Sequence, residues 1–143
     1  MKWIMLVLSM SLTACATIQL PPGSEESRSF VQESPMAYQD AYRIVAKQFR
    51  VCYRVIGIFG NGYDVQADLD AQANRGTIEL YSVGFTGAEK PEDSIFSRSV
   101  TIEQNGSGSR ITTTGTTPKY VYMTHLTVPS WLSGTVSCAP PRQ

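Results

Sequence analysis

The chain carries no net charge and only one histidine. Its 143 residues include 12 Lys and Arg against 12 Asp and Glu. This balance excludes the global positive field that draws a protein onto nucleic acid, so no nucleic-acid partner is expected. His125 has no neighbours at metal-ligand spacing, and no G-x-S-x-G sequence is present to hold a nucleophile. We therefore expect no metal, no cofactor and no catalytic activity.

Long apolar runs are missing as well. The most apolar stretch, from Trp3 to Leu12, covers about ten residues, which is too short to cross a bilayer as a helix. It follows the positive charge of Lys2, and small residues come directly after it, which is the arrangement of a cleaved signal sequence. Apolar residues still make up 42% of the chain, enough for one modest hydrophobic core after the leader is removed.

Leu12-Thr13-Ala14-Cys15 resembles the lipobox of bacterial lipoproteins, in which a branched apolar residue and two small residues precede an acylated cysteine. The resemblance implies that residues 1–14 are removed and that Cys15 carries acyl chains, which contribute about 0.8 kcal/mol per buried CH₂ to membrane binding. Ala16, rather than Asp, follows Cys15. By resemblance to the sorting pattern of enterobacterial lipoproteins, this predicts an outer-membrane anchor with the domain facing the periplasm. An ordinary secretory signal with a chance cysteine is the alternative.

Residues 15–34 are predicted to form the lipidated cysteine and a flexible tether. They contain Pro21-Pro22-Gly23-Ser24 and Glu25-Glu26-Ser27, a composition that cannot bury enough apolar area to order a chain. Phe30 and Val31 are candidates for the first contact with the domain. A first strand through Arg28 to Gln32 is the alternative. Residues 35–143 then form a single periplasmic domain.

Two cysteines remain, Cys52 and Cys138. An exported domain meets an oxidising compartment, where a pair of thiols tends to close. The bridge would tie the C-terminal segment to the end of the first helix and constrain the unfolded chain by roughly 4–5 kcal/mol. Two free thiols or a redox pair are the alternatives, although the C-x-x-C spacing of a redox pair is absent.

Hydrophobic periodicity predicts an α+β fold, with one N-terminal amphipathic helix packed on an antiparallel sheet of about four to five strands. Ser34-Pro35 is typical of a helix start, and Tyr38, Val45 and Phe49 fall on one face of a helix from Met36 to about Tyr53. A β-sandwich with the helix as an appendage is the competing architecture.

The strands of this sheet are expected where apolar and polar residues alternate. A hairpin turn is expected at Asn105-Gly106-Ser107-Gly108. One helical turn is expected at 129–133, where Trp131 would cap the core near the bridge. The predicted strands cover residues 63–69, 77–83, 95–104, 110–117 and 119–128.

Four cations form the most unusual feature of the predicted helix. Arg43, Lys47, Arg50 and Arg54 are spaced 4, 3 and 4 residues apart, so a helix places them in one stripe opposite its apolar face. This cationic stripe is a candidate contact for anionic lipid headgroups or for an acidic envelope protein, with each charge contributing on the order of 1 kcal/mol near an anionic surface. A solvated helix face, with cations favoured by the helix dipole, is the alternative.

Three other groups have weaker functional interpretations. His125 is expected on the exposed face of the strand over 119–128. Asp64, Asp68 and Asp70 share one face of a strand, where a solvated face is favoured over a calcium site because the glycine and glutamate of an EF-hand loop are missing. The aromatic residues Tyr120, Tyr122 and Trp131 are candidates for lining a sugar or peptide surface, or for ordinary packing.

The whole chain resembles small single-domain lipoproteins of proteobacterial envelopes. The resemblance rests on the lipobox, on Ser34-Pro35 opening a helix that runs into Cys52-Tyr53, and on Trp131 near Cys138. These cues are architectural, so the resemblance assigns no catalytic or binding residue. We expect a non-catalytic envelope lipoprotein that binds or scaffolds another envelope component. The alternative is an inhibitor of a cell-wall lytic enzyme such as lysozyme.

Overall fold

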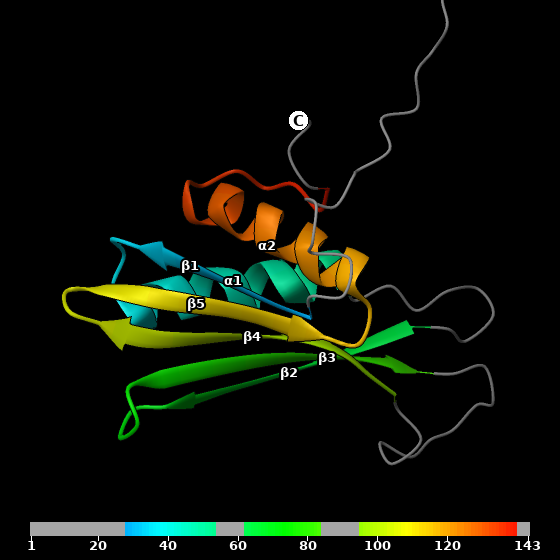
Figure 1. Ribbon diagram of the computed structural model, residues 1–143, viewed down its shortest axis with the longest axis horizontal. Coiled ribbons are helices and arrows are strands. Elements are labelled where there is room, and N and C mark those ends of the chain that lie inside the picture. Colours follow the sequence, from blue (N-terminus) through cyan, green and yellow to red (C-terminus); the bar gives the residue numbers. More distant parts are fainter. Residues whose placement is uncertain (1–27, 54–61, 84–94, 140–143) are drawn as a thin grey trace, which may run out of the picture.

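A computed structural model describes residues 28–53, 62–83 and 95–139. They form a five-stranded antiparallel sheet and two helices, an α+β fold as predicted (Figure 1). The strand order is β1-β5-β4-β3-β2. Neither helix in the described part of the chain is long and apolar enough to cross a membrane. The elements in chain order are β1 (Ser29–Ser34), α1 (Tyr38–Tyr53), β2 (Gly62–Asp70), β3 (Arg75–Val83), β4 (Ile95–Asn105), β5 (Gly108–Gly115) and α2 (Pro118–Leu132).

One face of the sheet forms the core, and both helices pack against it. In Figure 1, α1 lies behind the sheet and α2 lies beside α1, over β1 and β5. Residues of β3, β4 and β5 that point toward the helices are fully buried, because strand side chains alternate between the two faces. The buried apolar core includes Ile78, Leu80, Val100, Ile102, Ile111, Val45, Phe49, Val128 and Trp131.

Four of the predicted strands correspond to β2, β3, β4 and β5, and the predicted turn joins β4 to β5. Gly106 in this turn has φ of 60°, a backbone conformation that favours glycine. The predicted helix over 36–53 corresponds to α1, which begins at Tyr38. Ser34 does not cap it, because its hydroxyl accepts a hydrogen bond from the Met36 amide at 3.2 Å, before the helix begins.

The strand predicted over 119–128 is wrong, since these residues belong to α2. Pro118 occupies the first turn of the helix, where its fixed φ is favourable and its missing N–H costs nothing. Val121, Thr124, Val128 and Trp131 are buried at helical spacing, a period that the run of aromatic and β-branched residues masked. The single turn predicted at 129–133 is the last part of the same helix.

Side-chain hydrogen bonds adapt α2 to its unfavourable composition. The hydroxyls of Thr124 and Thr127 donate to the carbonyls four residues earlier, at 3.0 and 2.7 Å, so neither is buried without a partner. Pro129 lies inside the helix and cannot donate to the carbonyl of His125. The side-chain amide of Gln32 donates to that carbonyl instead, at 3.4 Å, and so links β1 to α2.

The predicted tether extends too far, because residues 29–34 form β1. This strand pairs antiparallel with β5, from Ser29 opposite Thr114 to Ser34 opposite Ser109. Phe30 packs against Tyr122 of α2, with ring centroids 5.2 Å apart. Pairing with β5 and burial under α2 order a segment whose composition resembles a linker. The alternative of a first strand near Arg28 to Gln32 is therefore correct, and the domain starts before residue 35.

The predicted disulfide is present between Cys52 and Cys138, whose Cα atoms are 5.3 Å apart. It joins the end of α1 to the segment that follows α2. Trp131 lies in the core as predicted, edge-on to Phe49 at 5.5 Å, and its indole N–H donates to the carbonyl of Ser137 at 2.6 Å. The bridge and the indole therefore hold the same C-terminal segment against α1.

Candidate docking groove

The structure describes three members of the cationic stripe. Arg43, Lys47 and Arg50 are all exposed on α1, whereas Arg54 lies outside the described residues. Arg43 forms an ion pair with Asp40 at 3.3 Å, but both side chains are more than 60% exposed, so the pair contributes little to stability. Within the described part of the chain, Lys47 and Arg50 have no carboxylate at ion-pair distance.

One member of the stripe, Arg50, lies beside β2. Arg50 lines a cavity of about 190 Å³ together with Tyr63, Asp64 and Val65 of that strand. One turn from Arg50 along α1, Ala46 is buried; one turn further, the Tyr42 ring lies over Gly76, where an added Cβ would be 2.8 Å from its Cγ. Burial raises the pKa of the Tyr42 hydroxyl, and the nearby charges of Arg50 and Asp68 act on it in opposite directions. This side of α1 therefore faces β2 and β3.

β2 is an edge strand whose helix-facing side is incompletely covered. Val65 and Ala67 lie opposite Leu80 and Ile78 of β3, but they are only partly buried, whereas their partners are fully buried. Tyr63 is 43% exposed and Leu69 is 36% exposed on the same side. We define the α1–β2 groove by Arg50, Tyr63, Asp64 and Val65, which line the cavity, together with Tyr42 and Leu69; Lys47 is exposed on α1 one turn before Arg50.

The opposite face of β2 carries the three aspartates. Asp64, Asp68 and Asp70 are exposed on one face, as alternation predicts. Asp70 accepts hydrogen bonds from the amides of Gln72 and Ala73, both at 3.0 Å, and so stabilises the turn into β3. Among the described residues, no three His, Cys, Asp or Glu side chains are grouped so as to hold a metal ion.

A row of alternating charges crosses the sheet on that open face. The strand register places Asp70, Arg75, Glu103, Arg110 and Glu33 side by side across all five strands. Arg110 pairs with Glu33 at 3.3 Å, and the Asn105 amide donates to the same carboxylate. Opposite charges on neighbouring strands stabilise a particular register. No single strand shows this pattern, so sequence reasoning missed it.

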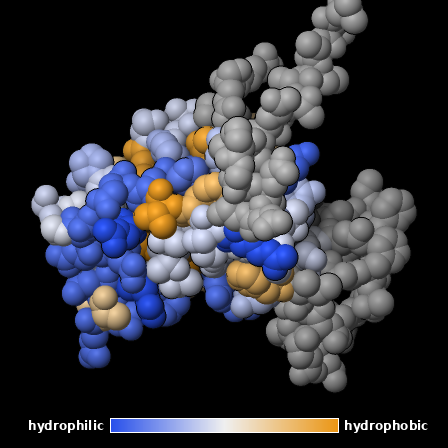
Figure 2. Space-filling model, in the orientation of Figure 1, coloured by the Kyte–Doolittle hydropathy of each residue, from blue (hydrophilic) through white to orange (hydrophobic). Residues whose placement is uncertain are grey.

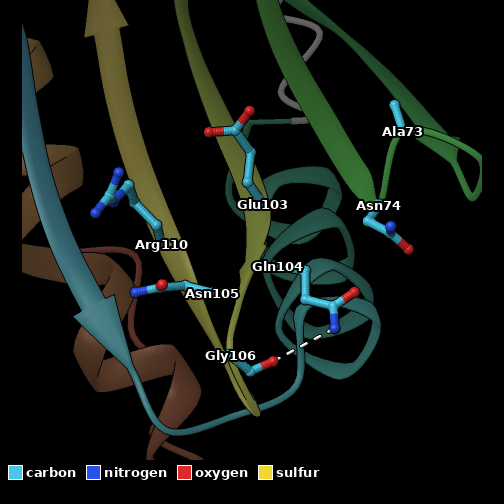
Figure 3. Close-up of a pocket in the computed structure, with 7 residues that line it drawn as sticks. All are labelled: Ala73, Asn74, Glu103, Gln104, Asn105, Gly106 and Arg110. Atoms are coloured by element: carbon cyan, nitrogen blue, oxygen red, sulfur yellow. Dashed lines mark hydrogen bonds between the residues drawn. The ribbon is translucent and has the colours of Figure 1, made fainter.

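Figure 3 shows the hollow beside this row, which has a volume of about 600 Å³. Glu103 and Arg110 rise from β4 and β5, and the Gln104 amide donates to the Gly106 carbonyl at 3.3 Å. The lining is polar and mostly exposed. In the view of Figure 2 hydrophilic residues dominate the described surface, and apolar residues form only small separate patches. We therefore assign the charge row to strand register and regard the α1–β2 groove as the candidate site.

His125 was predicted to lie on an exposed strand face, but it is half-buried on α2. Its ring stacks on Phe30 at 5.4 Å, and its Nδ1 is buried without a hydrogen-bond partner. Burial lowers the pKa of His125 below its ordinary value of 6.5, because the charged imidazolium loses hydration there. The two tyrosines predicted on the same segment have different surroundings. Tyr122 packs on Phe30, whereas Tyr120 is exposed.

The lowered pKa of His125 predicts a loss of stability in mild acid. The unfolded chain binds a proton near pH 6.5 and the folded chain only at lower pH, so this stability is complete above pH 6.5 and falls as the pH drops through the window below it. We expect the Tm to fall between pH 7.5 and pH 5.5, and His125→Phe to reduce that fall while keeping the contact with Phe30. An equal change in Tm for both proteins would contradict this.

No family model matches the chain, and the comparisons with curated proteins and with solved structures found no match.

Proposed function

We propose that this protein is a non-catalytic lipoprotein, anchored through Cys15 to the outer membrane with its domain in the periplasm. It binds an extended acidic segment of another envelope protein along the α1–β2 groove. The observation that carries this proposal is the placement of Arg50, with the exposed Lys47 one turn away on α1, beside an edge strand with partly exposed apolar side chains. Cys15 and residues up to 27 lie outside the described residues, so the anchor rests on the lipobox resemblance.

The edge of β2 supplies the main-chain part of the binding. Among the described strands, β2 pairs only with β3, so its outer N–H and C=O groups face away from the other strands of this sheet. An extended segment adds to such an edge through backbone hydrogen bonds, and alternate side chains provide specificity. The side chains on its helix-facing side would contact Tyr63, Val65 and Leu69 where they are apolar and would meet Arg50 and Lys47 where they are acidic. These exposed charges act mainly on the association rate and its salt dependence.

Reversing the two charges tests this docking. The native lipoprotein is crosslinked in cells and purified, and mass spectrometry identifies the partner. We expect Lys47→Glu combined with Arg50→Glu to weaken binding of that partner about thirtyfold, as two contacts near 1 kcal/mol each imply, and to lower its recovery accordingly. Arg28→Glu with Lys119→Glu is the matched control, because both residues are exposed and outside the groove. Equal recovery with both double variants would refute the groove.

A membrane arm separates a protein partner from a lipid one. The mature chain with Cys15→Ser is mixed with vesicles containing an anionic phospholipid, before and after the same charge reversal. The proposal predicts that neither protein binds. Vesicle binding that Lys47→Glu and Arg50→Glu abolish would assign the stripe to lipid headgroups instead.

The anchor has its own test. Cys15→Ser removes the thiol that accepts the lipid, so we expect the protein to move from the membrane pellet to the soluble periplasmic fraction. Fractionation and immunoblotting measure the distribution. A variant that still pellets with membranes would show that lipid on Cys15 is not what holds the protein there.

A further inference from the structure

A second candidate site surrounds Arg98, a residue that no pattern in the sequence indicated. Arg98 lies on β4 opposite Leu80, on the helix-facing side of the sheet, and is only 6% exposed. Its neighbours on this side of β4 are Val100 and Ile102, which belong to the apolar core. An ionised side chain in such a row is costly unless something compensates its charge.

Two aromatic rings provide part of that compensation. The guanidinium carbon of Arg98 is 4.6 Å from the ring centroid of Tyr53 on α1 and 5.7 Å from that of Tyr120 on α2. Ring faces attract the positive charge, but they do not accept the in-plane N–H groups as hydrogen bonds. The Nε atom of Arg98 is buried and has no hydrogen-bond partner, and no carboxylate of the described residues forms an ion pair with Arg98.

Arg98 also lines a cavity of about 220 Å³ at the junction of α1, α2 and the sheet. Tyr53, Tyr63 and Tyr120 form aromatic walls, and Met123 adds an apolar surface. Thr124 and Thr127 line the cavity too, but their hydroxyls already donate to carbonyls of α2. The Arg98 guanidinium is therefore the one cation among the described lining residues, and Tyr120, which is 50% exposed, borders the entrance from solvent.

We infer that this cavity binds a small organic anion, whose carboxylate or phosphate oxygens accept hydrogen bonds from Arg98 while its flat apolar part lies between the tyrosine rings. The fork of N–H donors on a guanidinium matches two oxygens of such a group. Aromatic walls favour a planar or apolar body over a free inorganic ion. The cavity is smaller than a typical drug-sized site, so the ligand is small. This cavity adjoins the α1–β2 groove and shares Tyr63 with it, but the inference does not depend on the docking proposed there.

Benzoate and phenyl phosphate are suitable probes, because they share a ring and differ in the anion, and benzyl alcohol is the neutral control. The mature chain with Cys15→Ser is titrated with each, and the Nε–H resonance of Arg98 is followed by NMR. We expect one or both anions to shift this resonance in a saturable manner at millimolar concentrations, and benzyl alcohol to leave it unchanged. The stronger anion identifies the oxygen group that the site prefers. A resonance that neither anion shifts would overturn the inference.

Substitutions of Arg98 then test whether binding of the probe requires its guanidinium or only the shape of the cavity. Arg98→Met keeps much of the side-chain volume and removes the charge, so we expect the affinity for the stronger probe to fall at least tenfold. Arg98→Lys keeps the charge without the fork and is expected to bind with intermediate affinity. Arg50→Met is the control, because it removes a cation from the groove and leaves the cavity intact. If Arg98→Met binds the probe as tightly as the unaltered chain, the ligand does not use the guanidinium and the inference fails.

Discussion

Replacing Cys52 and Cys138 together with alanine is expected to lower the free energy of unfolding by about 4–5 kcal/mol. The two cysteines are 86 residues apart in the sequence, so the bridge closes a long loop and removes many conformations from the unfolded chain. Urea unfolding of the oxidised protein and the double variant measures the difference. Because the unfolded state of the variant is less constrained, the dependence of the unfolding free energy on urea should also increase.

The single variant Cys52→Ala is the control for this prediction. It removes the same loop and leaves Cys138 as a free thiol, so its loss should equal that of the double variant. The indole of Trp131 still holds Ser137 by a hydrogen bond at 2.6 Å, and we therefore expect both variants to fold in the absence of denaturant. An equal free energy of unfolding with and without the bridge would show that the bridge does not constrain the unfolded chain as its loop length predicts.

Trp131→Ala is expected to destabilise the domain by about 3–5 kcal/mol, the range for truncating a large buried aromatic side chain. Trp131 is 1% exposed and packs edge-on against Phe49 of α1, so its removal leaves a cavity between the two helices. It also leaves the Ser137 carbonyl without its donor. Thermal and urea unfolding of the oxidised protein provide the measurement.

Trp131→Phe separates the two roles of this side chain. Phenylalanine keeps a ring against Phe49 but cannot donate to Ser137, so most of the lost packing is restored and one hydrogen bond, worth about 1 kcal/mol, is still missing. We expect its stability to lie between those of the native protein and Trp131→Ala. A Trp131→Ala variant within about 1 kcal/mol of the native protein would mean that the surrounding residues collapse into the space.

The elements with a clear local period were predicted well. The apolar face of α1 repeats every three to four residues, and apolar and polar residues alternate along β2 to β5. The segment 119–128 failed because β-branched and aromatic residues favour strands locally, whereas burial of Val121, Thr124 and Val128 against the sheet favours the helix. β1 was predicted only as the alternative to a tether, because its six mostly polar residues are ordered by pairing with β5 and by packing against α2.

The candidate sites also differ in whether a local sequence pattern could reveal them. The cations of α1 were found because one helix carries them all, and a helical period can be read within a short stretch. Arg98 gave no such signal, because Tyr53, Tyr63 and Tyr120, which surround it, come from three separate elements. The charge row across the sheet was missed for the same reason, since each of its members lies on a different strand.

By itself the sequence determined the local elements of this domain: the amphipathic face of α1, four strands, the turn at Gly106, and the pairing of the two cysteines left after Cys15. Only the tertiary structure decided that β2 is an edge beside the cations of α1, that residues 119–128 are helical, and that Arg98 lies between two tyrosines. The reason is physical. Periodicity and turn preference act between neighbours in the chain, whereas strand order, burial and the surroundings of a charge depend on contacts between distant segments.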